Sequence, residues 1–413
     1  MPRARIVLSL LLALGAQETS TLTEEDFLAA VISDSADHPA VAALAGEREI
    51  AAAEAVRASL LPNPVIEASV EEPDGAARET VAGVTWTPPL DGRRALRREA
   101  AAMGVAAAES RLEAARLRLR LELRAVYADW ALAWERRELL AAHLARVGEL
   151  AERSRARAAA GEIPGLAARR FTLEEAQARA DLGRAEARLA SAWSAMMAWV
   201  PGLAPSARPA LPALASPGTP PDLAGRPDLV AREREVERAE AVRRLSARVV
   251  EAPALGLGWK RIEERSATAS GPVVSVDWTV PLFGRSQRRQ ADRLEAEARL
   301  SAARVDLELA RARAAAERAG ALAAYQRFLT AAADADRSAA DVDGLLTGAT
   351  AAYQVGESGL TDLLDTLRAA LGTRLTTLEI REAALAAQRD LEAAIGANGA
   401  SGDIGATLSG DLP

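Results

Sequence analysis

The sequence WTPPLDGR at residues 86–93 recurs as WTVPLFGR at residues 278–285. In each copy a tryptophan closes a run in which apolar and polar residues alternate, and a glycine–arginine pair opens a long segment rich in Ala, Leu, Arg and Glu. The proline lacks the N–H that a strand ladder needs, so it ends a strand, and the glycine permits a tight turn. We therefore predict two strand-to-helix turns, made by Pro89, Gly92, Pro281 and Gly284.

Other short matches follow in the same order and indicate an internal two-fold repeat. The sequence AEAVR, for example, occurs at residues 53–57 and again at residues 239–243. We assign the first structural repeat to residues 17–200 and the second to residues 223–395. Residues 201–222 between them form a proline-rich linker that no helix can cross.

Each repeat contains one predicted β-hairpin, at residues 63–88 and at residues 253–281. The segment VIEASVE at residues 65–71 alternates with a period of two, as expected for a strand with one apolar and one polar face. The other three strands alternate in the same way. Charged residues dominate segments 72–79 and 261–271, which we predict to be the hairpin loops.

The rest of each repeat is predicted to be helical. We expect helices at about residues 24–59, 93–159, 166–200, 223–250, 285–353 and 360–395. The second of them would be about 100 Å long, so it must pack along its length against other helices. Gly161 and Gly356 interrupt the helical pattern and are predicted to reverse the chain at two tips.

The composition excludes several classes of function. The 413 residues hold 51 Lys and Arg against 58 Asp and Glu, a formal net charge of −7, so no nucleic-acid partner is expected. With no cysteine and only 2 histidines, disulfides, thiolate metal sites, iron–sulfur clusters and a Ser/His/Asp triad are disfavoured. We therefore expect a protein that is not an enzyme and that needs no cofactor and no metal.

The two ends of the chain indicate export and disorder. Residues 1–16 have the arginines, the apolar run and the small residues of a secretory signal peptide. Residues 396–413 are rich in Gly and Ser and are predicted to be a disordered tail. No later segment has the pattern of a membrane-spanning helix, so any membrane span of the exported chain must be built from strands.

The hairpins allow two interpretations. They form either a small β-domain in a soluble helical protein or part of a membrane barrel whose apolar face meets lipid. Export, strand length and the positions of Trp86 and Trp278, where an aromatic belt would lie at the membrane surface, favour the barrel. Four strands cannot close a barrel, and lipid does not tolerate open edges, so several copies must assemble. These arguments leave two, three or four protomers open.

Further motifs point to a known family. They are LLPNP at residues 60–64, AGE at 160–162, RPDL at 226–229, YQVGE at 353–357 and LLD at 363–365. With the two Pro-Leu-x-Gly-Arg turns, they make the chain resemble the TolC-like outer-membrane factors of tripartite efflux pumps from about residue 22 to residue 395. The run PLDGRR at residues 89–94, with Arg97 and Arg98 after it, is most similar to the heavy-metal (cobalt–zinc–cadmium type) branch. Many members carry a lipidated cysteine, which this chain lacks.

The resemblance implies an α+β membrane protein. Four strands from each protomer of a homotrimer would form a 12-stranded barrel in the bacterial outer membrane, continuous with a long helical barrel in the periplasm. The trimer would be a passive exit duct that receives its substrate from an inner-membrane transporter through a periplasmic adaptor. Whether metals, drugs or proteins pass through it is left open. A periplasmic coiled-coil adaptor or scaffold without a barrel is the alternative.

Three groups of residues are candidates for functional roles. They are the tips Gly161, Glu162, Gly356 and Glu357, the acids Asp362 and Asp365, and the arginines Arg93, Arg94, Arg97 and Arg98. The tips would contact the adaptor, or their glutamates are simply solvated. The two aspartates share a helix face and would form acidic gate rings if that face lines the pore, or else stabilise the start of their helix. The arginines would face solvent or lie against anionic lipid headgroups.

Overall fold

The computed structural model describes most of the chain between residue 21 and residue 396. The described ranges are 21–32, 39–72, 77–89, 92–200, 207–218, 222–247, 252–264, 266–278 and 285–396. The predicted signal peptide 1–16, nearly all of the predicted tail, Pro281 and Gly284 lie outside them.

The chain forms two compact units, and each takes segments from both predicted repeats. The tip unit comprises Met1–His38, Ala115–Leu223 and Ala314–Pro413. The sheet unit comprises Pro39–Ala114 and Ala224–Arg313. Two long helices, α4 (Arg93–Ala159) and α7 (Arg285–Ala340), contribute to both units.

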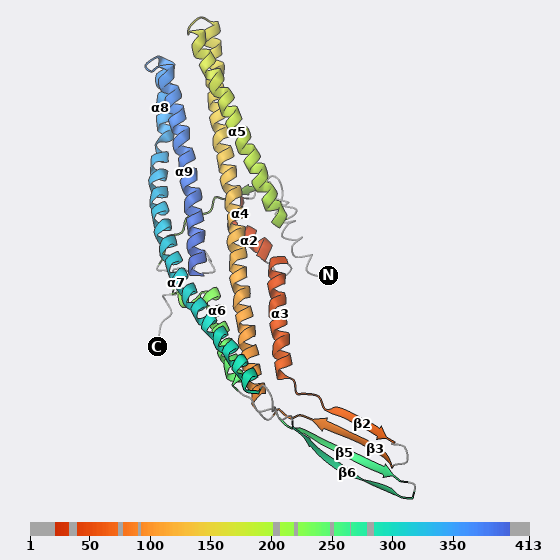
Figure 1. The fold of residues 1–413 in the computed structure, drawn as a ribbon. Helices are drawn as coiled ribbons and strands as arrows, with labels where there is room; N and C mark the ends of the chain where they lie inside the picture. The colour runs from red at the N-terminus through yellow and green to blue at the C-terminus, as the bar shows by residue number, and fades with distance from the viewer. Residues whose placement is uncertain are drawn as a thin grey trace, which may run out of the picture. The chain divides into compact units, whose positions relative to one another are not determined.

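The sheet unit holds a four-stranded antiparallel sheet in the order β2-β3-β5-β6 (Figure 1). Its strands are β2 (Val65–Glu71), β3 (Arg78–Trp86), β5 (Ala254–Glu263) and β6 (Thr268–Asp277). Both predicted hairpins form, and the β3–β5 pairing joins one hairpin to the other. The helices α3 (Pro39–Ser59) and α6 (Pro227–Ser246) complete the unit together with the first parts of α4 and α7.

The predicted hairpin loops were too long. β3 already begins at Arg78, β5 continues to Glu263 and β6 begins at Thr268. Charged residues are accommodated in these strands because they pair across the ladder, as Lys260 does with Glu79. At its other end β6 stops at Asp277, four residues before the predicted end of the hairpin at residue 281.

Most of the predicted helices form with the expected bounds. α4 and α9 (Leu360–Ile395) match the prediction, and α5 (Gly165–Trp199) is displaced by one residue. The predicted helix 24–59 contains α2 (Glu24–Ile32) and α3, with residues 33–38 between them not described. The predicted helix 223–250 is a short 3₁₀ turn followed by α6, which begins at Pro227 because proline fits the first helical turn but not the interior.

The predicted single helix 285–353 was wrong. α7 ends at Ala340, and a separate helix α8 (Val342–Val355) follows Asp341. Aspartate and the nearby Gly344 are poor helix formers, and Val342 is buried against the core of the tip unit. The interruption therefore coincides with weak local helix propensity and with a buried residue, and the overall helical pattern of the sequence does not reveal it.

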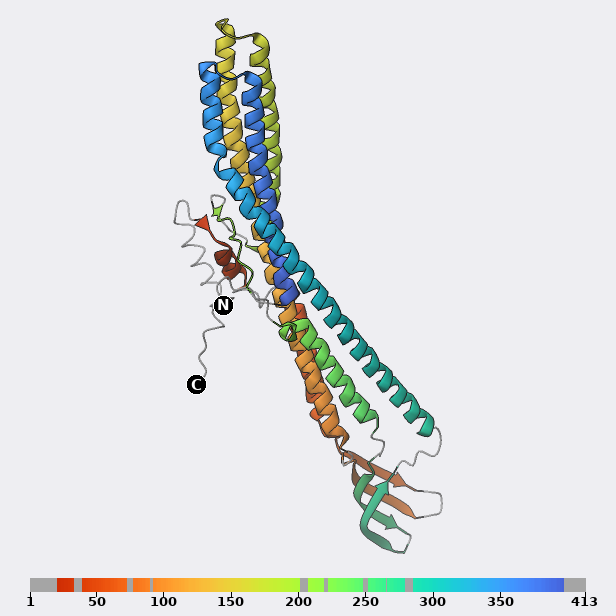
Figure 2. The same ribbon diagram turned by 90° about the vertical axis from the view of Figure 1, so that its left-hand side faces the viewer.

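The tip unit is built on packed helices. Figure 2 shows α4, α5, α8 and α9 running side by side, and one buried cluster joins all four. Its larger members are Leu150, Phe171, Leu346, Leu363 and Leu367. Among the described helices, none is long and apolar enough to cross a membrane.

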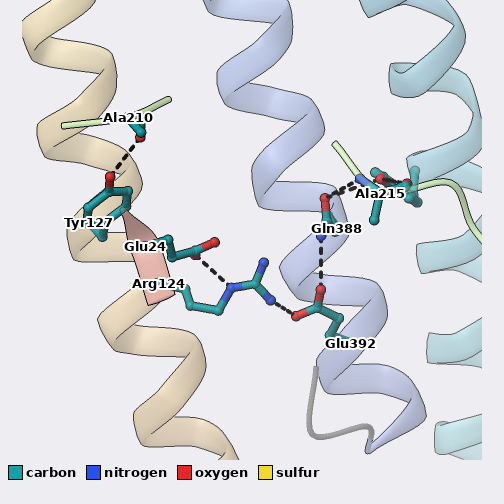
Figure 3. Close-up of polar contacts among 8 residues, drawn as sticks. Glu24, Arg124, Tyr127, Ala210, Ala215, Gln388 and Glu392 are labelled. Atoms are coloured by element: carbon teal, nitrogen blue, oxygen red, sulfur yellow. Dashed lines mark hydrogen bonds and ion pairs between the residues drawn. The ribbon is translucent and has the colours of Figure 1, made fainter. Parts of the chain in front are cut away.

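A short parallel strand pair lies beside these helices. β1 (Thr21–Leu22) pairs with β4 (Arg208–Pro209), so the segment before the first repeat's helices meets the linker between the repeats. The hydroxyl oxygen of Tyr127 on α4 lies 2.7 Å from the carbonyl oxygens of Leu22 and Ala210. Figure 3 shows the contact with Ala210. Burial raises the pKa of Tyr127 well above its ordinary value. The tyrosine therefore stays neutral and ties both segments to the helix.

A buried ion triad lies next to this tyrosine. Arg124 on α4 donates to Glu24 on α2 at 2.7 Å and to Glu392 on α9, and its side chain is 8% exposed (Figure 3). Burial alone would lower the pKa of Arg124, but the two carboxylates outweigh it and raise the pKa. Gln388 donates to Glu392 at 3.1 Å and accepts from the backbone N–H of Ala215. Three helices and the linker therefore meet at one polar centre.

Candidate functional site: a curled sheet and two helix tips

One face of the sheet is an exposed apolar surface. The strand register aligns Ile66, Val84, Leu257 and Val274 in one row across all four strands. Their exposed fractions are 82%, 45%, 67% and 75%. Soluble monomers rarely expose a contiguous apolar patch of this kind, so this face is built to meet something other than water.

The opposite face is small, polar and tightly curled. A Cβ atom added to Gly256 would lie 2.1 Å from the Ser275 Oγ, and one added to Gly258 would lie 2.9 Å from the carbonyl oxygen of Ala82. Gly256 is buried although its neighbours Leu255 and Leu257 are exposed. Glycine at these positions lets the sheet curl, as the ribbon in Figure 2 shows. The buried Gly256 and the exposed leucines beside it indicate that the glycine face lies on the inside of the curl.

The two outer strands leave the sheet open. Among the described residues, β2 pairs only with β3, and β6 pairs only with β5. Each outer strand therefore presents a row of unpaired backbone N–H and C=O groups. A curled sheet with two open edges can be completed by strands of further copies.

Exposed tryptophans flank the apolar face. Trp86 and Trp278 lie at the end nearest the helices and are 38% and 60% exposed. The Trp86 indole N–H donates to the carbonyl oxygen of Pro62 at 2.9 Å. A third tryptophan on the apolar face, Trp259, was not assigned to the belt from the sequence; it is 55% exposed and pairs in register with Pro272. Pro272 is six residues before Trp278, which corresponds to about 20 Å along the strand. Because Trp259 pairs with Pro272, it lies at the opposite border of the apolar face from Trp278.

The first strand-to-helix turn is described in part. Gly92 has φ +72°, a left-handed conformation, and α4 begins at the next residue. Arg94 donates to the carbonyl oxygen of Ser59 at 2.9 and 2.6 Å, which links α4 to the end of α3. Pro89 lies between the end of β3 and this turn.

The two tips have the same backbone geometry. Gly161 and Gly356 have φ +77° and +81°. At the first tip the backbone N–H of Glu162 donates to the carbonyl oxygen of Arg157 at 2.9 Å, and the N–H of Gly161 donates to that of Ala158 at 3.1 Å. At the second tip the N–H groups of Glu357 and Gly356 make the equivalent bonds. This is the Schellman pattern, which satisfies the last carbonyls of a helix.

Replacing Gly161 or Gly356 with alanine should destabilise its tip by about 1–2 kcal/mol, because an L side chain is strained at positive φ. Hydrogen exchange of the tip amides should accelerate accordingly. Gly183→Ala is the matched control: Gly183 lies inside α5 with open space around it and no positive φ. It should slow exchange or leave it unchanged, and equal acceleration in both variants would contradict the prediction.

Several tip side chains already have partners. Glu162 pairs with Arg157 at 3.2 Å. The Asp362 carboxylate accepts the Gly359 N–H at 3.1 Å and so caps the start of α9. Asp365 lies 3.7 Å from Arg368. Arg368 donates to Glu174 on α5, and this hydrogen bond raises the pKa of Arg368. The capping role expected for acids at this position is therefore present for Asp362, and both aspartates are exposed on one helix face.

The tips also carry exposed apolar residues that the sequence analysis did not single out. Leu166 follows the first tip and is 66% exposed, and Val355 precedes the second and is 71% exposed. Val355 directly precedes the turn glycine Gly356, and Leu166 directly follows Gly165 at the start of α5; a neighbouring glycine is the signal that could have identified each of them. Apolar side chains beside solvated turns are suited to receive a partner.

His143 lies on α4 against α8 and α9 rather than on a solvated face. It lines a cavity of about 30 Å³ together with Arg146, Leu346, Leu367 and Arg374. Burial lowers the pKa of His143. Among the described residues, no group of acidic residues, His or Cys is arranged to hold a metal ion.

No family model and no curated protein matches this sequence. Solved structures do match its fold. CusC, a protein that forms a transmembrane channel, has 20% identity and a TM-score of 0.70, with 90% of this chain and 92% of that chain covered. The CmeC outer-membrane channel of Campylobacter jejuni has 16% identity and a TM-score of 0.70 (93% and 91% covered). The outer-membrane protein VceC of Vibrio cholerae has 20% identity and a TM-score of 0.70 (89% and 96% covered). The chain therefore has the fold of outer-membrane channel proteins.

Proposed function

We propose that this protein is the outer-membrane exit duct of a tripartite efflux pump. The single observation that supports this most strongly is the polarity of the curled sheet, which is apolar on its outer face and small and polar on its inner face. A β-sheet in lipid needs that arrangement, because its outside contacts acyl chains and its inside contacts water. A sheet that packed against its own helices would have the apolar face covered.

Three copies would complete the sheet. The open edge of β6 in one copy would pair with the open edge of β2 in the next, giving a barrel of 12 strands from three times four. The helices would close in the same way into a periplasmic helical barrel. This homotrimer would lie in the outer membrane and extend into the periplasm, as the resemblance to TolC-like factors implies.

The tips would form the periplasmic mouth of the duct. Gly161, Glu162, Gly356 and Glu357 would meet a periplasmic adaptor, and an inner-membrane transporter would deliver the substrate through it. Leu166 and Val355, exposed beside the same turns, would add apolar contact area. The duct itself would bind no cofactor and use no energy.

Cell fractionation tests the proposal against a periplasmic adaptor or scaffold without a barrel. The duct should be released from the envelope only by detergent and should run on gels as a trimer that dissociates on heating. Electron microscopy of the purified protein should show a hollow tube with a short barrel. Release by osmotic shock as a soluble monomer would refute the duct and favour the alternative.

Replacing both Asp362 and Asp365 with alanine should raise single-channel conductance in planar bilayers, if the two acids form constricting rings at the mouth. Block by added divalent cations should weaken in the same variant. Asp362 also caps α9, so Asp362→Asn with Asp365→Asn, which keeps a capping oxygen, separates charge from helix stability. Unchanged conductance and unchanged cation block in the asparagine variant would remove the gate hypothesis.

The substrate is proposed on the resemblance alone. The PLDGRR run favours heavy-metal cations such as cobalt, zinc or cadmium ions. Deleting the gene should then lower resistance to these ions, and loss of resistance to dyes or detergents alone would indicate a drug-exporting pump.

A further inference from the structure

Four exposed arginines lie at the helix ends nearest the sheet. They are Arg57 near the end of α3, Arg97 and Arg98 near the start of α4, and Arg243 in the last turn of α6. We call this group the arginine collar. All four belong to the sheet unit, so their positions next to β2, β3 and β5 are part of one compact body.

Several arginines further from the sheet pair with an acid on a neighbouring helix. Arg48 pairs with Glu109 at 3.3 Å, Arg111 with Glu235 at 2.6 Å and Arg304 with Glu240 at 2.6 Å. Within the part of the chain that the structure describes, none of the four collar arginines has an ion-pair partner. Ion pairs between helices therefore account for the positions of Arg48, Arg111 and Arg304 but not for those of the collar arginines.

Two of the described acids near the collar are already paired with other arginines. Glu54 lies 3.6 Å from Arg238, and Glu99 lies 2.5 Å from Arg244. The first turn of α4 contains no acidic residue. Cations near a helix N-terminus are disfavoured by the macrodipole, so the arginines that open α4 do not stabilise the helix itself. The four collar arginines are therefore left exposed at this end of the sheet, without an ion pair to the described residues.

The loop end of the sheet has the opposite arrangement. There Arg78 pairs with Glu72 at 3.8 Å, Lys260 with Glu79 and Arg261 with Glu263 at 2.7 Å. The described cations at that end are thus neutralised by neighbours on the same sheet. Of the two ends of the described sheet, the one that Trp86 and Trp278 border is thus the one with arginines that have no ion pair to the described residues.

We propose that the arginine collar binds the phosphates of anionic phospholipid headgroups at the periplasmic surface of the outer membrane. The proposal rests on the proposed function, because it needs the apolar face of the sheet to lie in lipid. A headgroup lies just outside the hydrocarbon layer, which is where the collar follows the two border tryptophans. Arginine suits this role because its planar guanidinium binds phosphate through two parallel hydrogen bonds.

Quenching of the fluorescence of the protein's own tryptophans by brominated lipids measures whether anionic lipid is preferred over neutral lipid next to the protein. The full chain is reconstituted in phosphatidylcholine vesicles that contain increasing fractions of dibrominated phosphatidylglycerol or of dibrominated phosphatidylcholine. Trp86, Trp278 and Trp259 report which lipid lies against the sheet. We expect phosphatidylglycerol to be preferred by about fivefold or more, given the attraction of a surface arginine to anionic lipid, and 1 M salt should reduce the preference.

Two matched variants locate the effect. In the collar variant Arg57, Arg97, Arg98 and Arg243 are all changed to Gln. This variant should bind phosphatidylglycerol and phosphatidylcholine almost equally. The control variant changes four other exposed arginines away from the sheet to Gln, namely Arg118, Arg169, Arg313 and Arg327. It alters the net charge equally and should keep the full preference.

The outcomes separate this inference from the duct itself. Equal quenching by both brominated lipids in the unmodified protein would refute headgroup binding by the arginine collar, but it would be consistent with a sheet embedded in the membrane. Equal loss of preference in both variants would also overturn it, because net charge would then be the cause. Absence of quenching by either lipid would place the sheet outside the membrane and refute the proposed function.

Discussion

Ile66→Lys is expected to abolish assembly of the protein in the membrane. Ile66 is 82% exposed and lies in the row with Val84, Leu257 and Val274, between the two tryptophan borders. A lysine on the lipid face near the bilayer midplane costs about 2–4 kcal/mol. Each copy in a trimer bears this cost, so heat-dissociable trimers should disappear from membrane fractions.

Ser69→Lys is the matched control. Ser69 is on the same strand but on the opposite, inner face, and it is also exposed. The inner face would be wet, so the control should assemble normally. In a soluble protein the Ile66 change should be close to neutral, within about 0.5 kcal/mol, because the side chain is already in water. Normal trimers or a fully folded soluble chain with Ile66→Lys would contradict the duct.

Arg124→Met is expected to destabilise the tip unit by about 3–5 kcal/mol, because it leaves two buried carboxylates without their cation. The side chains of Glu24 and Glu392 are only 17% and 12% exposed. The variant should also release β1 and the linker from the helices, since both are anchored next to this centre. Thermal unfolding followed by circular dichroism and limited proteolysis around residue 210 measure the two effects.

Arg136→Met is the control for this change. Arg136 also joins α4 to α9, through Glu379 at 3.2 Å, but Glu379 is 60% exposed. A surface pair of this kind contributes at most about 1 kcal/mol. Changing Glu24 and Glu392 to Gln in the Arg124→Met background should recover part of the loss, because no buried charge then remains unpaired. Equal effects of the two methionine variants would show that burial of the triad does not matter.

The helices and hairpins were largely predictable from local pattern. The bounds of α4 and α9 follow from the glycines beside them and from the charge-rich helical composition between. The strands follow from alternation, although their charged outer parts were taken as loops because cross-strand pairs such as Lys260 with Glu79 are invisible without the register. The break at Asp341 was missed because the surrounding segment keeps a helical pattern, and the burial of Val342 next to it is visible only in the tertiary structure.

The candidate site was predicted only in part. The two border tryptophans, the tip glycines and the two aspartates stand out in the sequence because each recurs in both repeats or follows a clear break. Trp259, Leu166 and Val355 do not stand out, since their significance depends on which neighbours cover them. The capping bond of Asp362 and ion pairs between helices, such as that of Arg48 with Glu109, likewise become visible only in the three-dimensional structure.

The sequence by itself determined the secondary structure and the two faces of the strands, because alternation, helical composition, proline and glycine act within a few residues of each other. Only the tertiary structure decided that β3 and β5 join the two hairpins, that the apolar face is exposed and that the collar arginines have no ion pair to the described residues. It also divided the chain into two compact units that cut across the repeats. The physical reason is that burial and ion pairing depend on residues distant in the chain, which local pattern cannot bring together.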